Sequence, residues 1–188
     1  MNINKISSSD MPGILKTALV LLAVCTICAS LLAAAYVVTA PIIAANSEVE
    51  VKSALSGIFP DYSSRTEAKY EADKDVDRVM TVYDAGGSVL GYAAEVSPSG
   101  FANDITMIIG ISTDFKVIKI AIISISETAG IGSRVNNESY LSTYAGAGSD
   151  VNFGNGVDAI SGATYSSRGV LRGVKAAITA CEALYKEE

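Results

Sequence analysis

The feature that most constrains this chain is an apolar run near its beginning. Residues 14–40 read ILKTALVLLAVCTICASLLAAAYVVTA, and the only charged residue in the run is Lys16. About 20 helical residues cross the hydrocarbon core of a bilayer, and a lysine near the end of such a helix can extend its ammonium group to the interface. The alternative is a cleaved signal peptide, whose apolar core is typically about 7–15 residues long. The longer run favours a retained transmembrane helix that leaves the membrane near Pro41 and Asn46.

The charges on either side of the run predict how the chain crosses the membrane. Lys5 and Lys16 come before or at the start of the span, whereas Glu48 and Glu50 follow it, although Lys52 weakens the contrast. Positively charged residues remain preferentially on the cytoplasmic side. We therefore expect a single-pass protein of the cell membrane with a short cytoplasmic N-terminus and an extracytoplasmic soluble domain.

After the apolar run the periodicity is helical and then becomes that of strands. Val49, Leu55 and Phe59 follow a helical spacing that stops at Pro60, which predicts a stalk helix, and a polar stretch follows as a linker. The expected organisation is a cytoplasmic N-terminus at 1–13, a transmembrane helix at 14–40, a stalk helix and linker at 41–75, and a folded domain at 76–188.

The folded domain is predicted to be α+β, with a β-sheet covered by helices. RVMTVYD and VLGYAAEV flank a turn at 84–87 and indicate a hairpin, and DITMIIGIS and VIKIAIISIS indicate two further strands. The last two segments are apolar on both faces, so helices are expected to cover the sheet. From Tyr165 onward, apolar residues recur at helical spacing and predict a terminal amphipathic helix; they are Val170, Leu171, Val174, Ile178, Cys181 and Tyr185.

The composition excludes several classes of function. A formal net charge of -6 argues against nucleic acid as a partner, because phosphate backbones need a surplus of Lys and Arg on one face. The chain has no histidine, which excludes Ser-His-Asp and Cys-His catalysis and histidine-based zinc or haem sites. No G-x-G-x-x-G follows a predicted strand, so no dinucleotide-dependent hydride transfer is expected. We predict neither a metal site nor a catalytic residue.

The three cysteines do not form a disulfide framework. Cys25 and Cys28 make a C-x-x-C in the middle of the predicted span, where thiolates are costly to form, so a packing role is favoured. A metal or iron–sulfur site shared with a neighbouring membrane subunit would need two further ligands and stays open as an alternative. Cys181 lies far downstream in the predicted terminal helix.

The stretch DAISGATYSS, residues 158–167, directly precedes that terminal helix. Gly162 and Ala163 are small and leave the Thr164 hydroxyl uncovered. The first N–H groups of a helix have no partner within the helix and favour a bound phosphate, and Arg168, about one turn along, could reach an anionic oxygen. By spacing alone the commoner interpretation is a helix cap made by Thr164.

The motif also resembles a known one. Asp158, Ser161, Gly162, Ala163 and Thr164 match the D-x-x-S/T-G-A-T flavinylation motif of FMN-binding domains. The chain is similar to the G subunit of Rnf-type electron transport complexes and to the C subunit of the sodium-pumping NADH:quinone reductase. The resemblance implies one N-terminal span, an extracytoplasmic FMN domain, and FMN held covalently by a phosphodiester bond to Thr164.

A second segment supports the resemblance. ETAGIG, residues 127–132, is similar to the ETPGLG segment that lies beside the flavin in this family, and Gly91-Tyr92 is a weaker match to a Gly-Tyr pair. Ala129 replaces the usual proline, which leaves the loop less rigid, and Ile125 stands where many relatives have histidine. Without the first motif, ETAGIG would be interpreted as a glycine turn between a strand and a helix at NNESYLSTYA.

The resemblance further implies an electron carrier that works within a membrane ion-translocating ferredoxin:NAD oxidoreductase complex, without turnover of its own. Its partners would be the other membrane subunits and, during maturation, a flavin transferase that uses FAD and a divalent metal and recognises Asp158. The expected cofactor-binding residues are Thr164, Ser161, Gly162, Ala163, Glu127, Thr128 and Arg168. Two alternatives stay open: an anchored FMN carrier of another extracytoplasmic respiratory chain, and a cofactor-free binding module in which SGAT is only a cap.

Overall fold

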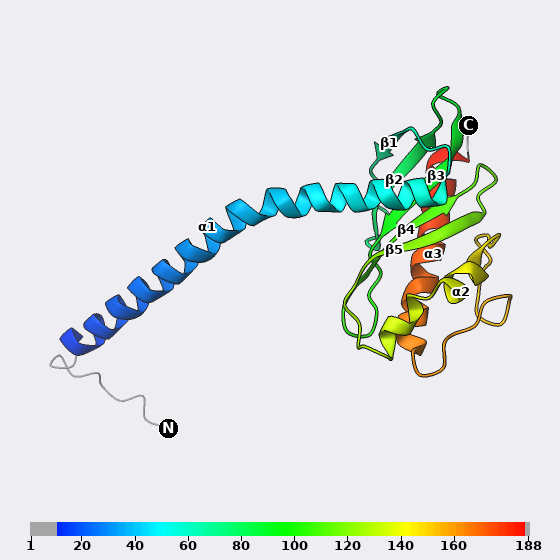
Figure 1. The fold of residues 1–188 in the computed structure, drawn as a ribbon. Helices are drawn as coiled ribbons and strands as arrows, with labels where there is room; N and C mark the ends of the chain where they lie inside the picture. Colours follow the sequence, from blue (N-terminus) through cyan, green and yellow to red (C-terminus); the bar gives the residue numbers. More distant parts are fainter. Residues whose placement is uncertain (1–10, 187–188) are drawn as a thin grey trace. The chain divides into compact units, whose positions relative to one another are not determined.

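The computed structural model of the protein describes residues 11–186 (Figure 1). The chain divides into two units, one that ends at Glu48 and one that begins at Val49. Lys5, on which the orientation argument partly depends, lies outside the described residues, as does most of the segment 1–13. Helix α1, Met11–Ile58, contributes to both units, and the second unit holds the sheet and the remaining helices.

Helix α1 contains the predicted membrane span. By length and composition, Leu15–Ile58 is the one helix of the described residues that could cross a membrane, with a mean hydropathy of 2.6 in its most apolar stretch. Its hydroxyl groups bond within the helix: Thr26 Oγ1 donates to the Leu22 carbonyl at 2.8 Å, and Ser30 Oγ donates to the Thr26 carbonyl at 2.7 Å. Such internal bonds are needed where no water is present.

The helix continues beyond the predicted span without ending at proline. Pro41 lies inside α1, which ends only at Ile58, two residues before Pro60. The predicted stalk is therefore the last part of the same helix. Its buried face differs from the predicted one in one residue, because Leu55 and Phe59 are buried whereas Val49 is 67% exposed.

The second unit is built on one antiparallel sheet of five strands in the order β1-β2-β3-β4-β5. The predicted hairpin and the two further strands are all present. The bounds are β1 Ser64–Ala68, β2 Val76–Tyr83, β3 Val89–Val96, β4 Ile105–Ile111 and β5 Val117–Ile125. In the β2–β3 turn, Asp84 Oδ1 accepts hydrogen bonds from the N–H groups of Gly86 and Ser88, both at 2.8 Å.

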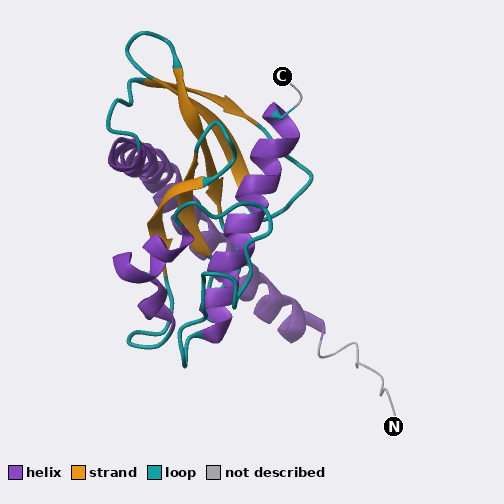
Figure 2. Ribbon diagram, turned by 90° about the vertical axis from the view of Figure 1, so that its right-hand side faces the viewer, coloured by secondary structure: helices purple, strands orange, loops and turns teal. Residues whose placement is uncertain are grey.

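Both faces of the sheet are covered, as the apolar strands predicted. Helix α3, Thr164–Tyr185, packs against β2, β3 and β4 on one face (Figure 2). The end of α1 covers the other face, where Val51, Leu55, Ile58 and Phe59 form a core with Met80, Val82, Ala93 and Ile108. Successive strand residues such as Met107 and Ile108 point to opposite cores, as the two-residue period of a strand requires.

Strand β1 lies in the stretch that was expected to be a linker. It pairs with β2 at the edge of the sheet, and none of its five residues is fully buried. Arg65 and Arg78 both form ion pairs with Glu67, at 2.9 Å each. These paired charges give the strand the composition of a loop, so hydrophobic periodicity alone does not reveal it.

Short helices connect β5 to α3. The predicted helix at NNESYLSTYA is two short pieces, α2 at Glu138–Leu141 and the 3-10 helix η2 at Ser142–Tyr144, and a further 3-10 helix, η1, spans Gly132–Val135. Tyr140 and Tyr144 anchor this region, since both side chains are buried and their hydroxyls are hydrogen-bonded at 2.9 Å. Their position brings the segment after β5 alongside the beginning of α3, which contacts η1.

Candidate functional site

Thr164 is the first residue of α3 and does not cap it. The N-cap is Ala163, and no side chain makes a capping hydrogen bond at this end of the helix. Thr164 is exposed, and among the described residues nothing accepts from or donates to its hydroxyl. The alternative in which Thr164 serves as a cap is therefore wrong, and the hydroxyl is available for chemistry.

The loop before Thr164 is held against the first turn of α3. Gly162 has φ +81°, a conformation that residues with a side chain rarely adopt. The Ala163 N–H donates to the Ile160 carbonyl at 2.8 Å, and the Ile160 N–H donates to the buried Ser167 Oγ at 3.1 Å. These bonds fix the turn that presents the Thr164 hydroxyl at the surface.

The carboxylate of Glu127 joins the two motifs found in the sequence. Its Oε1 accepts from the N–H of Phe101 at 2.7 Å, and its Oε2 accepts from Ser166 Oγ at 3.1 Å. The Ala102 N–H lies within 3.4 Å of both oxygens. ETAGIG and SGAT thus meet through Glu127 and Ser166, two residues after Thr164, and the loop after β3 joins them.

Two glycines make room for this carboxylate. A Cβ on Gly132 would lie 2.2 Å from Glu127 Oε2 and 2.8 Å from Ser166 Oγ. A Cβ on Gly100 would lie within van der Waals overlap of Glu127 Oε1. The last glycine of ETAGIG is therefore required by close packing, and the segment is more than a glycine turn.

Two exposed aromatic rings lie near each other at the beginning of α3. Tyr165, the next residue, is 65% exposed, and its ring lies 5.9 Å from that of Phe101, which is 67% exposed. The Arg168 guanidinium sits over the Tyr165 ring at 5.9 Å, so the arginine expected to reach a phosphate contacts an aromatic face. Ile131 of ETAGIG is 52% exposed. Exposed apolar side chains that gather in one patch can mark a ligand-binding surface.

The remaining residues that the sequence singled out make fewer contacts. The Thr128 carbonyl accepts from the N–H groups of Ile131 and Ser133, and its side chain is exposed. Asp158 is exposed and makes no hydrogen bond with another described residue, so it does not cap a turn. The Gly91-Tyr92 pair does not belong to the site, because Tyr92 stacks on Tyr185 at the far end of α3.

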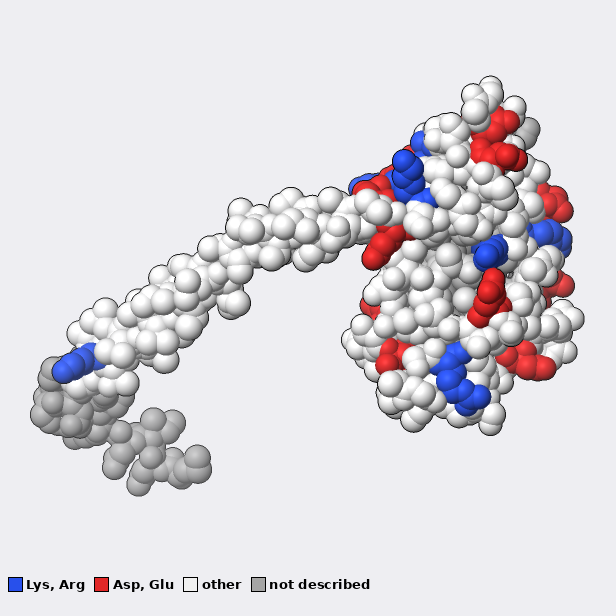
Figure 3. Space-filling view, in the orientation of Figure 1, with Lys and Arg blue, Asp and Glu red and all other residues white. Residues whose placement is uncertain are grey.

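The structure adds residues that the sequence did not single out. Phe101 and Ser166 are tied to Glu127, and Arg134 Nη1 donates to the Ser161 carbonyl at 2.8 Å. Arg134 follows the ETAGIG segment by two residues in the sequence. This closeness in sequence is the one feature from which its place in the site could have been predicted. Figure 3 shows Lys and Arg side chains at the end of the domain where α3 begins.

Cys181, the cysteine of this domain, is buried. Burial raises the pKa of the Cys181 thiol to about 12, so this cysteine stays protonated at neutral pH. Among the described residues no three His, Cys, Asp or Glu side chains gather as a metal site would require. Cys25 and Cys28 are free thiols on the α1 span.

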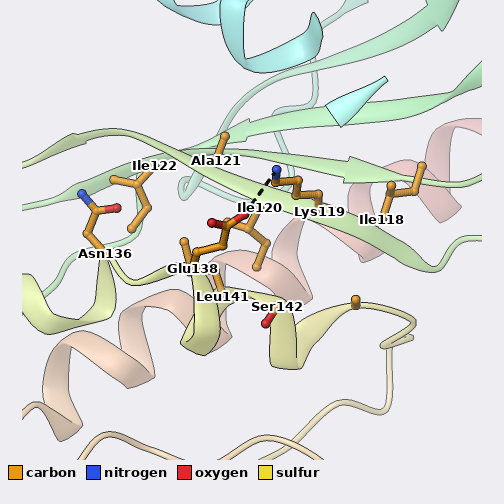
Figure 4. A pocket seen from close by; sticks show the side chains of 10 residues that line it. Ile118, Lys119, Ile120, Ala121, Ile122, Asn136, Glu138, Leu141 and Ser142 are labelled. Carbon is orange, nitrogen blue, oxygen red and sulfur yellow. Dashed lines mark ion pairs between the residues drawn. The ribbon is translucent and has the colours of Figure 1, made fainter. Parts of the chain in front are cut away.

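A separate groove lies beside strand β5. It has a volume of about 500 Å³, and Figure 4 shows that β5 residues line one side and α2 and η2 residues the other. Lys119 and Glu138 form an exposed ion pair across it at 3.7 Å. No residue of either motif lines this groove, so it is distinct from the Thr164 site.

Comparison with known proteins identifies the family. Residues 9–58 match the RnfG N-terminal region, and residues 100–179, which contain both motifs, match the FMN-binding domain. The G subunit of the ion-translocating oxidoreductase complex of Methanosarcina acetivorans is 30% identical over 181 residues, which cover 90% of this chain and 95% of that protein. The chain belongs to the family of Rnf-type G subunits.

One further relative and one solved structure are also similar to this chain. The G subunit of the proton-translocating ferredoxin:NAD(+) oxidoreductase complex of Clostridium ljungdahlii is 25% identical over 82% of this chain and 84% of that protein. The crystal structure of NqrC from Shewanella oneidensis has the same fold, with a TM-score of 0.50 and 22% identity over 65% of this chain and 68% of that one. The predicted fold class and family resemblance are therefore confirmed.

The close packing at Gly132 yields a stability prediction for this protein. We expect Gly132→Ala to displace the Glu127 carboxylate and to lower the free energy of unfolding by about 1–3 kcal/mol, the cost of disrupting charge-assisted hydrogen bonds. Urea denaturation of the full chain in detergent measures the change. Gly57→Ala is the matched control, because nothing lies within 4 Å of its added Cβ. Equal stability of the two variants would contradict the assigned role of Gly132.

Proposed function

We propose that this protein carries FMN covalently, through a phosphodiester bond to Thr164, and relays electrons within an ion-translocating ferredoxin:NAD oxidoreductase complex. The observation that carries the proposal is the exposed, unpartnered hydroxyl of Thr164 at the start of α3, inside the D-x-x-S-G-A-T motif of an FMN-binding domain. Bound FMN would supply the redox chemistry, and the protein its position and surroundings.

The residues around Thr164 fit a flavin phosphate ester. The first N–H groups of α3 lack partners within the helix and lie at the positive end of its dipole, where a phosphodiester is stabilised. Phe101, Tyr165 and Ile131 provide exposed apolar surface against which a planar ring system can pack. Glu127 has both oxygens engaged by Phe101, Ala102 and Ser166, so its role is to hold this surface in place.

Attachment is a displacement at phosphorus. The Thr164 oxygen attacks the flavin-side phosphorus of FAD, the phosphoanhydride bond breaks, and AMP leaves; the hydroxyl proton passes to a base of the flavin transferase. No oxidation or reduction occurs in this step. The loop around Thr164 leaves the hydroxyl accessible to FAD, because Gly162 and Ala163 have small side chains or none and the hydroxyl is exposed.

The proposed setting is a single-pass membrane protein with its FMN domain outside the cytoplasm. The apolar part of α1 supports the span, and Lys16 at its beginning with Glu48 and Glu50 after it supports the orientation. The partners are the other subunits of the complex and, during maturation, the flavin transferase, which uses FAD and a divalent metal. Attachment through a covalent bond would keep the flavin on the carrier on that side of the membrane.

Replacement of the attachment residue tests the proposal directly. We expect the parent protein to give a flavin-fluorescent band on a denaturing gel and Thr164→Val to give none, because valine keeps the shape of the side chain but lacks the oxygen. Thr179→Val, at an exposed position of the same helix, is the control and should stay fluorescent. A fluorescent Thr164→Val band would disprove the attachment site, and a dark parent band would favour the cofactor-free alternative.

Asp158 is proposed to act during attachment and not afterwards. Its carboxylate is exposed and makes no hydrogen bond with another described residue, and a carboxylate near a finished phosphodiester would repel it. We expect Asp158→Ala to keep the circular dichroism spectrum of the parent but to lose most of its covalent flavin after co-expression with the transferase. Asp150→Ala, at another exposed position, should be flavinylated normally. Normal flavinylation of Asp158→Ala would remove Asp158 from the site.

The orientation can be tested with a protease. Protease added to cells stripped of any outer barrier should cleave after residue 45 and spare the residues before the span, because the proposed orientation exposes the domain outside. Protection in these cells together with digestion in inverted vesicles would reverse the orientation.

A further inference from the structure

Arg134 contacts the loop that precedes Thr164. It lies in η1, directly after ETAGIG-Ser, and its Nη1 donates to the Ser161 carbonyl at 2.8 Å. The same nitrogen lies 4.0 Å from where a Cβ on Gly162 would be. The guanidinium is therefore in contact with the turn whose next residues are Ala163 and Thr164.

The charge of Arg134 is not neutralised by the described part of this chain. Three other arginines form ion pairs: Arg65 with Glu67, Arg78 with Glu67 and Glu95, and Arg172 with Asp75. Arg134 has no carboxylate within ion-pair distance among the described residues, although the sequence carries a net charge of -6. The one hydrogen bond that its guanidinium makes with another described residue, to the Ser161 carbonyl, uses one of five N–H donors.

An open recess lies next to this guanidinium. Arg134, Asn136, Asn137, Ser139, Tyr140 and Ile160 line a space of about 410 Å³, which is within the range of small-molecule sites. The lining contains polar side chains and no carboxylate. A recess of this composition, with a single positive charge at its edge, suits an anionic group.

We propose that Arg134 is the phosphate-binding residue of the site and pairs with the phosphate of the flavin nucleotide beside Thr164. This inference rests on the proposed function. The planar guanidinium can give two N–H groups to one phosphate while a third stays on the Ser161 carbonyl. Arg168 is less suited to this role, because its guanidinium lies over the Tyr165 ring.

A pair of flavins separates phosphate binding from all other contacts. FMN carries the phosphate and riboflavin lacks it. The Thr164→Val substitution prevents ester formation, so that both flavins can bind only non-covalently. The affinity of each flavin for the full chain in detergent is measured by fluorescence quenching. We expect this protein to prefer FMN. We expect Arg134→Gln to lower FMN affinity about tenfold and to leave riboflavin affinity unchanged, which is the size of effect that charge-assisted hydrogen bonds give.

Two further variants sharpen the test. Arg134→Lys keeps the charge without the planar fork and should retain part of the preference for FMN. Lys69→Gln removes an equal charge from an exposed position after β1, at the opposite edge of the sheet from β5, and should change neither affinity. The preference for FMN in the Arg134-containing protein should also shrink as salt is added.

Three results would overturn the proposal. The first is the absence of any preference for FMN in the Arg134-containing protein, and the second is a preference for FMN that persists in Arg134→Gln. The third is an equal loss of FMN and riboflavin affinity in Arg134→Gln, which would mean that Arg134 only holds the Ser161 carbonyl in place. Because gel fluorescence of the Thr164-containing protein is scored separately, covalent attachment at Thr164 can stand while the role of Arg134 fails, or the reverse.

Discussion

The arrangement of the site depends on one carboxylate, that of Glu127. Three segments distant in sequence meet there: the loop after β3, the segment after β5 and the first turn of α3. A half-buried carboxylate is stable only when its oxygens accept hydrogen bonds, and this requirement is what draws the backbone N–H groups of Phe101 and Ala102 and the Ser166 hydroxyl together. The same carboxylate explains why residues 100 and 132 are glycines, because any side chain there would occupy the space of the carboxylate.

The site contains two kinds of surface, one apolar and one rich in hydrogen-bond donors. On one side Phe101 and Tyr165 present exposed rings, which suit a flat apolar group. On the other, the beginning of α3 and Arg134 present N–H donors, which suit an anion. Thr164 is the first residue of α3, and no described residue hydrogen-bonds to its hydroxyl. FMN combines an aromatic ring system and a phosphate in one molecule, so a surface with both properties matches it better than either property alone would.

Much of this could be predicted from sequence because the signals are local. The hairpin follows from a period of two residues, strands β4 and β5 from short apolar runs, and helix α3 from a period of 3.6 residues, and the Thr164 motif is contiguous. The functions of Phe101 and Arg134 depend on contacts across the fold, with residues 26 and 27 positions away, and no spacing rule encodes them. Strand β1 was not predicted, because charged residues that form ion pairs within the strand and with β2 replace the apolar alternation by which strands are usually recognised.

The continuity of α1 into the domain has a consequence for separating the domain from its anchor. Leu55, Ile58 and Phe59 are what shield Met80, Ala93 and Ile108 from water. A cut between residues 41 and 48 would leave that cover in place and release a soluble fragment. A cut after Pro60, where composition alone would set the boundary, would strip one whole face of the sheet and leave an adhesive apolar surface prone to aggregation. The same helix therefore fixes how short a crystallisable or secreted version of this electron carrier can be.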